Sequence, residues 1–159
     1  MPRPIGHIDL LAVGKMRSKH WRLAQADYAQ RLGFYTRLNL VEVKDFVGQG
    51  LPDGTAVQKE GDLLLKAAGS ANRIILLSPE GELLTSPALA QFLQKQIEVH
   101  GRLAFLIGGP VGFSDDVLAT AHHQIALSPL TFTHELARVI FLEQLYRAFT
   151  ILNGENYHK

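Results

Sequence analysis

The residues best suited to chemistry lie in the last third of the chain, and the first group is rich in glycine. Gly108-Gly109-Pro110-Val111-Gly112 follows an apolar run, so its glycines would let a ligand approach the main chain beside a helix N-terminus. The spacing is not that of the dinucleotide fingerprint, and no Lys with Ser or Thr follows as in a phosphate-binding P-loop. These glycines therefore fit a plain tight turn as well as a ligand loop.

The second group is the C-terminal tail. Tyr157 can stack on a base, the His158 imidazole can take up or release a proton, and Lys159 can contact phosphate. Ordering such a tail costs about 1–2 kcal/mol per residue in backbone entropy. A frayed terminus is therefore the default expectation, and a functional tail is the alternative.

Other kinds of site are not indicated. His122 and His123 are adjacent, His134-Glu135 does not extend into a zinc-binding helix motif, and the carboxylates do not cluster, so we expect no metal. The absence of cysteine excludes disulfides and thiolate chemistry and fits a reducing compartment. No apolar run is long enough for a membrane span, and the start of the chain lacks the apolar region of a signal peptide. We expect a cytoplasmic protein.

The elements that must position these residues follow from hydrophobic patterning. Strands are expected over 8–13, 38–43, 73–77, 103–107 and 125–127. Helices are expected over 21–32, 57–68 and about 134–152, with two more that begin at the N-caps Ser86 and Ser114, while Thr133 caps the last one. The alternation predicts a single α/β domain over residues 1–159, with a mostly parallel sheet and helices on both faces.

In such a sheet, ligands bind beyond the carboxyl ends of the strands. The expected strands that end at Leu77, Ile107 and Leu127 run into loops that contain Gly, Pro or Ser and few charges. These loops would suit a flat, uncharged group such as adenine.

Two features point to partners. The last helix is apolar nearly all round, which predicts burial on both sides and a homodimer through this helix, with a central helix inside the monomer as the alternative. The net charge of +1 divides into +5 through Arg37 and −4 beyond it. A basic N-terminal region is compatible with a polyanionic partner, although scattered surface lysines and arginines would give the same pattern.

Taken together, the chain resembles the RlmH family, SPOUT-class methyltransferases of the large ribosomal RNA. The resemblance covers essentially the whole chain. It rests on Leu11-Ala12-Val13-Gly14-Lys15, Ile107-Gly108-Gly109-Pro110, Leu127-Ser128, Thr131-Phe132, Arg138-Val139, Glu143-Gln144-Leu145-Tyr146-Arg147-Ala148 and Tyr157-His158-Lys159. One departure is Thr133, where many relatives have proline before the histidine.

The resemblance implies S-adenosylmethionine-dependent methylation of N3 of a pseudouridine in 23S rRNA, on the assembled 70S ribosome. It also implies a homodimer and a C-terminal trefoil knot. Carried over by position, the cofactor site falls on Leu77, Gly108, Leu127, Ser128, Pro129, Leu130, Thr131 and Phe132.

The remaining roles are hypotheses from side-chain chemistry. His158 would act as base or water-positioner, Tyr157 would stack on or orient the base, and Arg147 and Lys159 would hold phosphate or negative charge. Arg138 could serve as an ion-pair residue at the dimer interface. The expected RNA contacts are Lys15, Arg17, Lys19, Arg22 and Lys159. Another nucleotide-binding α/β enzyme and a non-catalytic ribosome-associated factor remain as alternatives.

Overall fold

The computed structural model describes residues 5–159. Residues 1–4 lie outside the described residues. They include Arg3, which counts toward the N-terminal charge, and the start of the segment considered as a signal peptide. Five strands alternate with five helices, as the sequence predicts. In chain order they are β1 (His7–Val13), α1 (Lys19–Leu32), β2 (Arg37–Val43), α2 (Asp53–Ala67), β3 (Arg73–Leu83), α3 (Ser86–His100), β4 (Arg102–Ile107), α4 (Asp115–Thr120), β5 (His123–Ala126) and α5 (His134–Leu152).

The strands form one sheet in the order β2-β1-β4-β3-β5, and every neighbouring pair is parallel. The predicted α/β class and parallel sheet are therefore confirmed. The trefoil knot stays a prediction.

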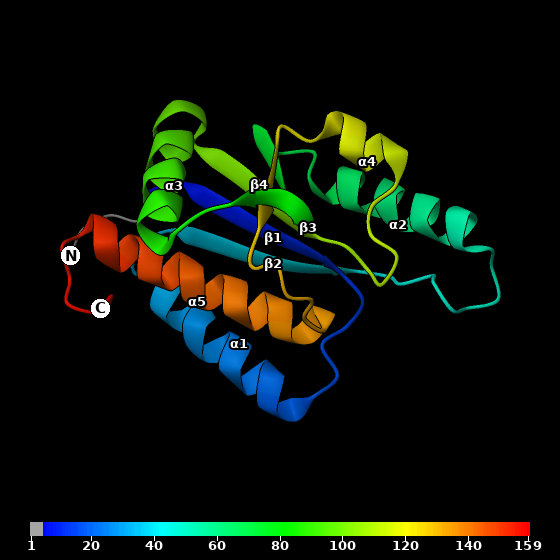
Figure 1. The fold of residues 1–159 in the computed structure, drawn as a ribbon, viewed down its shortest axis with the longest axis horizontal. Coiled ribbons are helices and arrows are strands. Elements are labelled where there is room, and N and C mark those ends of the chain that lie inside the picture. The colour runs from blue at the N-terminus through cyan, green and yellow to red at the C-terminus, as the bar shows by residue number, and fades with distance from the viewer. Residues whose placement is uncertain (1–4) are drawn as a thin grey trace.

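Helices cover both faces of the sheet (Figure 1). Successive residues of a strand point to opposite faces, so Leu10 and Phe105 pack with α3 and α5, whereas Leu11 and Leu106 pack with α2 and α4. Because both faces are buried, the central strands are continuously apolar, and this is why short apolar runs were a sound signal for them.

Two of the three predicted helix caps are confirmed. The side chains of Ser114 and Thr133 accept main-chain amide hydrogen bonds at the starts of α4 and α5. Ser86, predicted as the cap of α3, is instead its first residue, because Thr85 accepts the hydrogen bond from the Ala88 amide, at 3.2 Å. Either hydroxyl residue could cap a helix, so the sequence did not separate them.

Helix α5 lies between α1 and α3 on one face of the sheet (Figure 1). The expectation that one side of this helix needs a partner chain is therefore wrong for most of its apolar residues. Leu136 and Ile140 are different, because they are partly exposed and belong to neither core cluster. The homodimer itself stays a prediction. No helix within residues 5–159 has the length and apolar character needed to cross a bilayer.

Candidate active site

The predicted cofactor residues converge at the carboxyl edge of the sheet. Leu77 of β3 pairs with Ile107 of β4 on one side and with Ile125 of β5 on the other. Gly108 directly follows β4, and Leu127 directly follows β5. The three positions chosen from the sequence are therefore neighbours in space. The expected end of a strand at Leu77 is wrong, because β3 continues to Leu83 after an irregularity between Leu77 and Glu82.

The glycine-rich segment forms a closed turn with an accessible main chain. The Gly112 amide donates to the Gly109 carbonyl at 3.1 Å, and Gly112 has a φ of +85° that favours glycine. A Cβ on Gly108 would lie 3.1 Å from the Gly112 carbonyl oxygen. The segment is thus both a tight turn and a place where only glycine leaves room beside the main chain.

The loop at 127–133 is held by its own side chains. Ser128 Oγ accepts a hydrogen bond from the Leu130 amide at 3.0 Å, which shapes the turn. The Leu130 side chain is 70% exposed, and Phe132 is half-buried. This edge therefore presents an exposed apolar side chain on a loop without charged residues.

The C-terminal tail folds back onto α5, so the default expectation of a frayed terminus is wrong. The Tyr157 hydroxyl donates to Glu143 Oε1 at 3.1 Å, and Arg147 donates to the same oxygen at 2.6 Å. Arg147 Nη1 also lies 3.1 Å from His158 Nδ1. Glu155 accepts from the Tyr35 hydroxyl at 2.7 Å. These contacts offset the entropy of ordering the tail.

The predicted catalytic residues Arg147, Tyr157 and His158 thus meet around Glu143, which the sequence singled out only as part of a segment that carries the resemblance. We call these four residues the tail cluster. Partial burial and then the Glu143 carboxylate raise the pKa of Tyr157 to about 12, so its hydroxyl stays protonated. The hydrogen bond to Glu143 raises the pKa of Arg147. Tyr157 also lies under the Arg147 guanidinium, 4.9 Å from the ring centroid, so one face of its ring is covered.

The contact with Arg147 sets the state of His158. A guanidinium has only donors, so His158 Nδ1 must accept. Neutral His158 therefore carries its proton on Nε2 and presents an N–H donor. In this arrangement His158 can stabilise negative charge on an oxygen, and it would have to leave Arg147 to act as a base through Nδ1.

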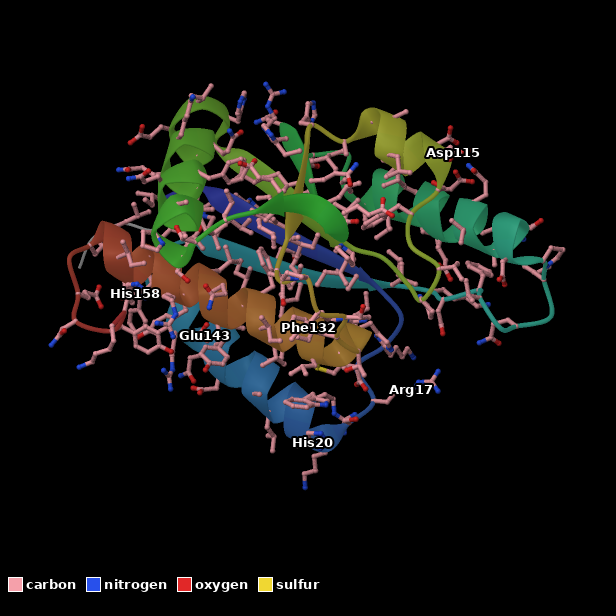
Figure 2. The ribbon with its side chains drawn as sticks, in the orientation of Figure 1. Arg17, His20, Asp115, Phe132, Glu143 and His158 are labelled. Atoms are coloured by element: carbon pink, nitrogen blue, oxygen red, sulfur yellow. The ribbon has the colours of Figure 1, made fainter. Side chains whose placement is uncertain are left out.

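Within one chain the tail cluster and the cofactor loops lie apart. Figure 2 shows His158 near one end of α5 and Phe132 near the other. At the helical rise of about 1.5 Å per residue, Arg147 is about 20 Å along the axis from the first residue of α5. A single chain in this conformation does not bring its tail to its own cofactor loops.

The predicted RNA-binding residues Lys15 and Arg17 lie in the β1–α1 loop, and Lys19 and Arg22 follow on α1; all four are exposed. Lys159 is exposed at the chain end, on the side of the tail cluster.

Two side chains of α5 hold the β1–α1 loop. Glu135 accepts from the amides of Arg17 at 2.5 Å and Ser18 at 3.0 Å, and these bonds lower the pKa of its carboxyl group, the Ser18 amide most. Arg138, which is 2% exposed, donates to the carbonyls of Val13 and Gly14.

Arg138 also pairs with Glu42 of the same chain at 2.8 Å. It is therefore not free to form an ion pair at a dimer interface, and that sequence-based reading of Arg138 is wrong.

Further along the same edge of the sheet, a hollow lies at the carboxyl ends of β1 and β2. This polar pocket, of about 280 Å³, is lined by Gly14, Lys15, Arg17, Asp45, Gln49, His134 and Glu135. The strand-end rule was applied only to the other three strands, so Asp45 and Gln49, which follow β2, were missed; the same rule applied to β2 would have found them. Glu135 lies in the first turn of α5, where that rule does not reach. Among residues 5–159, no cluster of three or more His, Asp or Glu side chains could hold a metal ion.

Comparison with known proteins identifies the class. A family model described as "Predicted SPOUT methyltransferase" matches residues 7–158. The chain belongs to the SPOUT methyltransferase family. SPOUT methyltransferases use S-adenosylmethionine.

Solved structures share the fold at low sequence identity. A probable methylase family protein from Haemophilus influenzae Rd KW20 is 15% identical with a TM-score of 0.56, over 96% of this chain and 70% of that one. TrmJ from Z. mobilis ZM4 is 16% identical with a TM-score of 0.51, over 98% and 73%. A probable methyltransferase from Bordetella pertussis Tohama I is 14% identical with a TM-score of 0.55, over 91% and 96%. At these identities the similarity concerns the fold alone.

Proposed function

We propose that this SPOUT methyltransferase is of the RlmH type and methylates N3 of a pseudouridine in 23S rRNA on the assembled 70S ribosome, and hence acts in the cytoplasm. The observation that supports this most is the tail cluster. Its residues Glu143, Arg147, Tyr157 and His158 belong to the segments that carry the resemblance to RlmH, and they form one hydrogen-bonded group.

The chemistry assigns a task to each part of the site. S-adenosylmethionine supplies a methyl group on a sulfonium, which becomes a neutral thioether as the methyl bonds to N3. The uncharged loops at the carboxyl edge hold the adenosine and fix the methyl in line with the base. The N3 proton leaves to water, and negative charge develops on the two adjacent carbonyl oxygens of the base.

The tail cluster stabilises that negative charge. His158 Nε2–H donates to a carbonyl oxygen as the charge develops, and Arg147 keeps the imidazole in that tautomer. Tyr157 stays a neutral phenol and orients the base. Glu143 acts through Arg147 and Tyr157 and is a positioning residue. Lys159 holds an RNA phosphate.

We further propose that the site is shared between two chains of a homodimer. The partly exposed Leu136 and Ile140 on α5, with exposed Leu130 before it, form an apolar surface suited to a two-fold contact. In an antiparallel pair of α5 helices centred on Ile140, the partner's Arg147 would be level with Thr133. The partner's tail cluster would then face these cofactor loops.

Transfer of labelled methyl from S-adenosylmethionine tests the function. The substrates are 70S ribosomes that lack the modification, with separate subunits and free 23S rRNA as controls. Label on one 23S nucleotide of intact ribosomes is the expected result. Cofactor binding without label on any substrate would refute the proposed substrate, and RNA binding without cofactor binding would favour a non-catalytic factor.

Complementation tests the shared site. His158→Ala removes the tail function, and Gly108→Val fills the space beside the Gly112 carbonyl. Each variant alone should be inactive. If the tail acts on the partner's cofactor, randomly mixed dimers should recover about a quarter of wild-type activity, because each mixed dimer holds one complete site. If the tail acts within its own chain, mixing recovers nothing. Melting curves of both variants show whether they fold.

A further inference from the structure

We propose that the polar pocket is the seat of the target nucleotide, and that Asp45 accepts the N1–H of the base and so selects pseudouridine over uridine. This inference rests on the proposed function and adds the recognition step. The pocket lies along the same sheet edge as the cofactor loops, since β1 pairs with β4, and His134 directly follows the loop at 127–133.

The lining of the pocket is graded from floor to rim. Gly14 forms a buried floor, Asp45 is half-buried, and Lys15, Arg17 and Gln49 are exposed at the rim. Its volume of about 280 Å³ lies just below the usual range for small-molecule sites, which fits one base better than a whole cofactor. Two cations at the rim can hold the phosphates on either side of a nucleotide whose base points inward.

Gly14 is what keeps the pocket open. It has a φ of +86°, and a Cβ there would lie 3.8 Å from the Cγ of Asp45 and 3.9 Å from the Cε1 of His134. Asp45 and His134 therefore face each other across a bare backbone position. A flat ring fits beside such a position more readily than beside a side chain.

Of the two carboxylates in the pocket, only Asp45 is free for a ligand. Glu135 is occupied by the amides of Arg17 and Ser18. The carboxylate of Asp45 forms no hydrogen bond or ion pair with any group in residues 5–159. An unpaired acceptor in a hollow suits a ligand that brings an N–H donor.

The main chain that carries Asp45 is held in place from below. Glu60, which is 2% exposed, accepts from the amides of Phe46 at 2.7 Å and Val47 at 3.0 Å. These hydrogen bonds tie the loop after β2 to α2. Asp45 is thus pre-positioned as an acceptor.

The chemistry of the base identifies the ligand. Uridine and pseudouridine share the N3–H edge, but only pseudouridine has a free N1–H, because its ribose is attached at carbon. An acceptor placed at N1 therefore separates the two bases, and a site built to bond a donor rejects the analogue that lacks it.

The test compares two kinds of 70S ribosome, one with pseudouridine at the target position and one with uridine there because the pseudouridine synthase is absent. Wild-type protein should prefer the pseudouridine ribosomes. Asp45→Ala should lower kcat/KM on those ribosomes about 10- to 100-fold, leave kcat/KM on the uridine ribosomes close to wild type, and leave S-adenosylmethionine binding unchanged. Asp45→Asn keeps an acceptor oxygen without the charge and should fall between. Asp53→Ala, the same change at an exposed position, should match wild type on both.

The outcomes separate this inference from the proposed function. An active wild-type protein that does not distinguish the two ribosomes overturns the inference alone, as does equal loss on both ribosomes in Asp45→Ala. A wild-type protein that methylates neither ribosome overturns the proposed function, and the inference falls with it. Loss of cofactor binding or a lowered melting temperature in Asp45→Ala would show that Asp45 is structural, and would also refute the inference.

Discussion

Replacing the buried Arg138 is expected to destabilise the fold far more than replacing an exposed arginine. Its guanidinium is the donor for the carbonyls of Val13 at 2.9 Å and Gly14 at 2.5 Å, and for the Glu42 carboxylate at 2.8 Å. In Arg138→Met the side-chain volume is nearly kept, so the cavity contribution is small. What remains is two buried carbonyls without donors, each costing about 1–3 kcal/mol.

Two effects reduce the free energy of unfolding that Arg138→Met is expected to lose. The Glu42 side chain is 40% exposed, so water can solvate it when its partner is gone. Arg138 Nε has no hydrogen-bond partner within the described residues, and its removal relieves that cost. The net loss should therefore be about 2–4 kcal/mol. For a chain of this size, that lowers the melting temperature by about 5–15 °C.

Thermal unfolding at neutral pH measures the effect, with Arg31→Met as the matched control. Arg31 pairs with Asp27 on the surface of α1, with side chains 44% and 54% exposed, so its loss should leave the melting temperature close to wild type. If Arg138→Met and Arg31→Met have the same melting temperature, the reasoning that Arg138 secures the β1–α1 loop is refuted.

Three further outcomes are expected. The pKa of Tyr157 is raised to about 12, so the tyrosinate absorbance that wild type gains over Tyr157→Phe in an ultraviolet pH titration should appear near pH 12. If that extra absorbance appears near pH 10, the burial of Tyr157 against Glu143 is contradicted. The pKa of Glu135 is lowered from its ordinary value of 4.5, so its stabilisation is present above that pH and is lost as pH falls through the folded pKa. Glu135→Gln should therefore have a lower melting temperature than wild type at neutral pH, and the two melting temperatures should converge in acid. A difference in melting temperature that stays constant with pH would contradict this. Gly108→Ala puts a Cβ 3.1 Å from the Gly112 carbonyl oxygen and should weaken S-adenosylmethionine binding in calorimetry, with Gly54→Ala, which meets no atom within 4 Å, as control.

The fold was predictable because its signals are local. Short apolar runs such as 103–107 are buried on both faces, and that composition is specific to central parallel strands. Strand order and the neighbours of α5 depend on contacts between distant segments. The pattern of α5 showed that it is buried on both sides, but not that α1 and α3 do the covering.

The candidate site divides in the same way. The strand-end rule pointed to Leu77, Ile107 and Leu127, which do lie side by side, because it needs only the approximate positions of the strands. It could not find Glu60 or Arg138, whose roles depend on main-chain groups far along the chain. Nor could side-chain chemistry alone show that His158 presents a donor, since that follows from its contact with Arg147.

The two halves of the proposed site are joined by one rigid element. Glu135 and Arg138, in the first turns of α5, fix the loop that carries the rim of the polar pocket, while Glu143 and Arg147, further along the same helix, fix the tail. The spacing between pocket rim and tail is therefore set by the rise of a helix and not by a flexible loop. In the proposed two-fold pair of such helices, the tail of one chain would meet the pocket of the other at a distance fixed by where the helices cross. Because the tail is already ordered on its own helix, under the proposed function it would not need to close over a bound substrate to act.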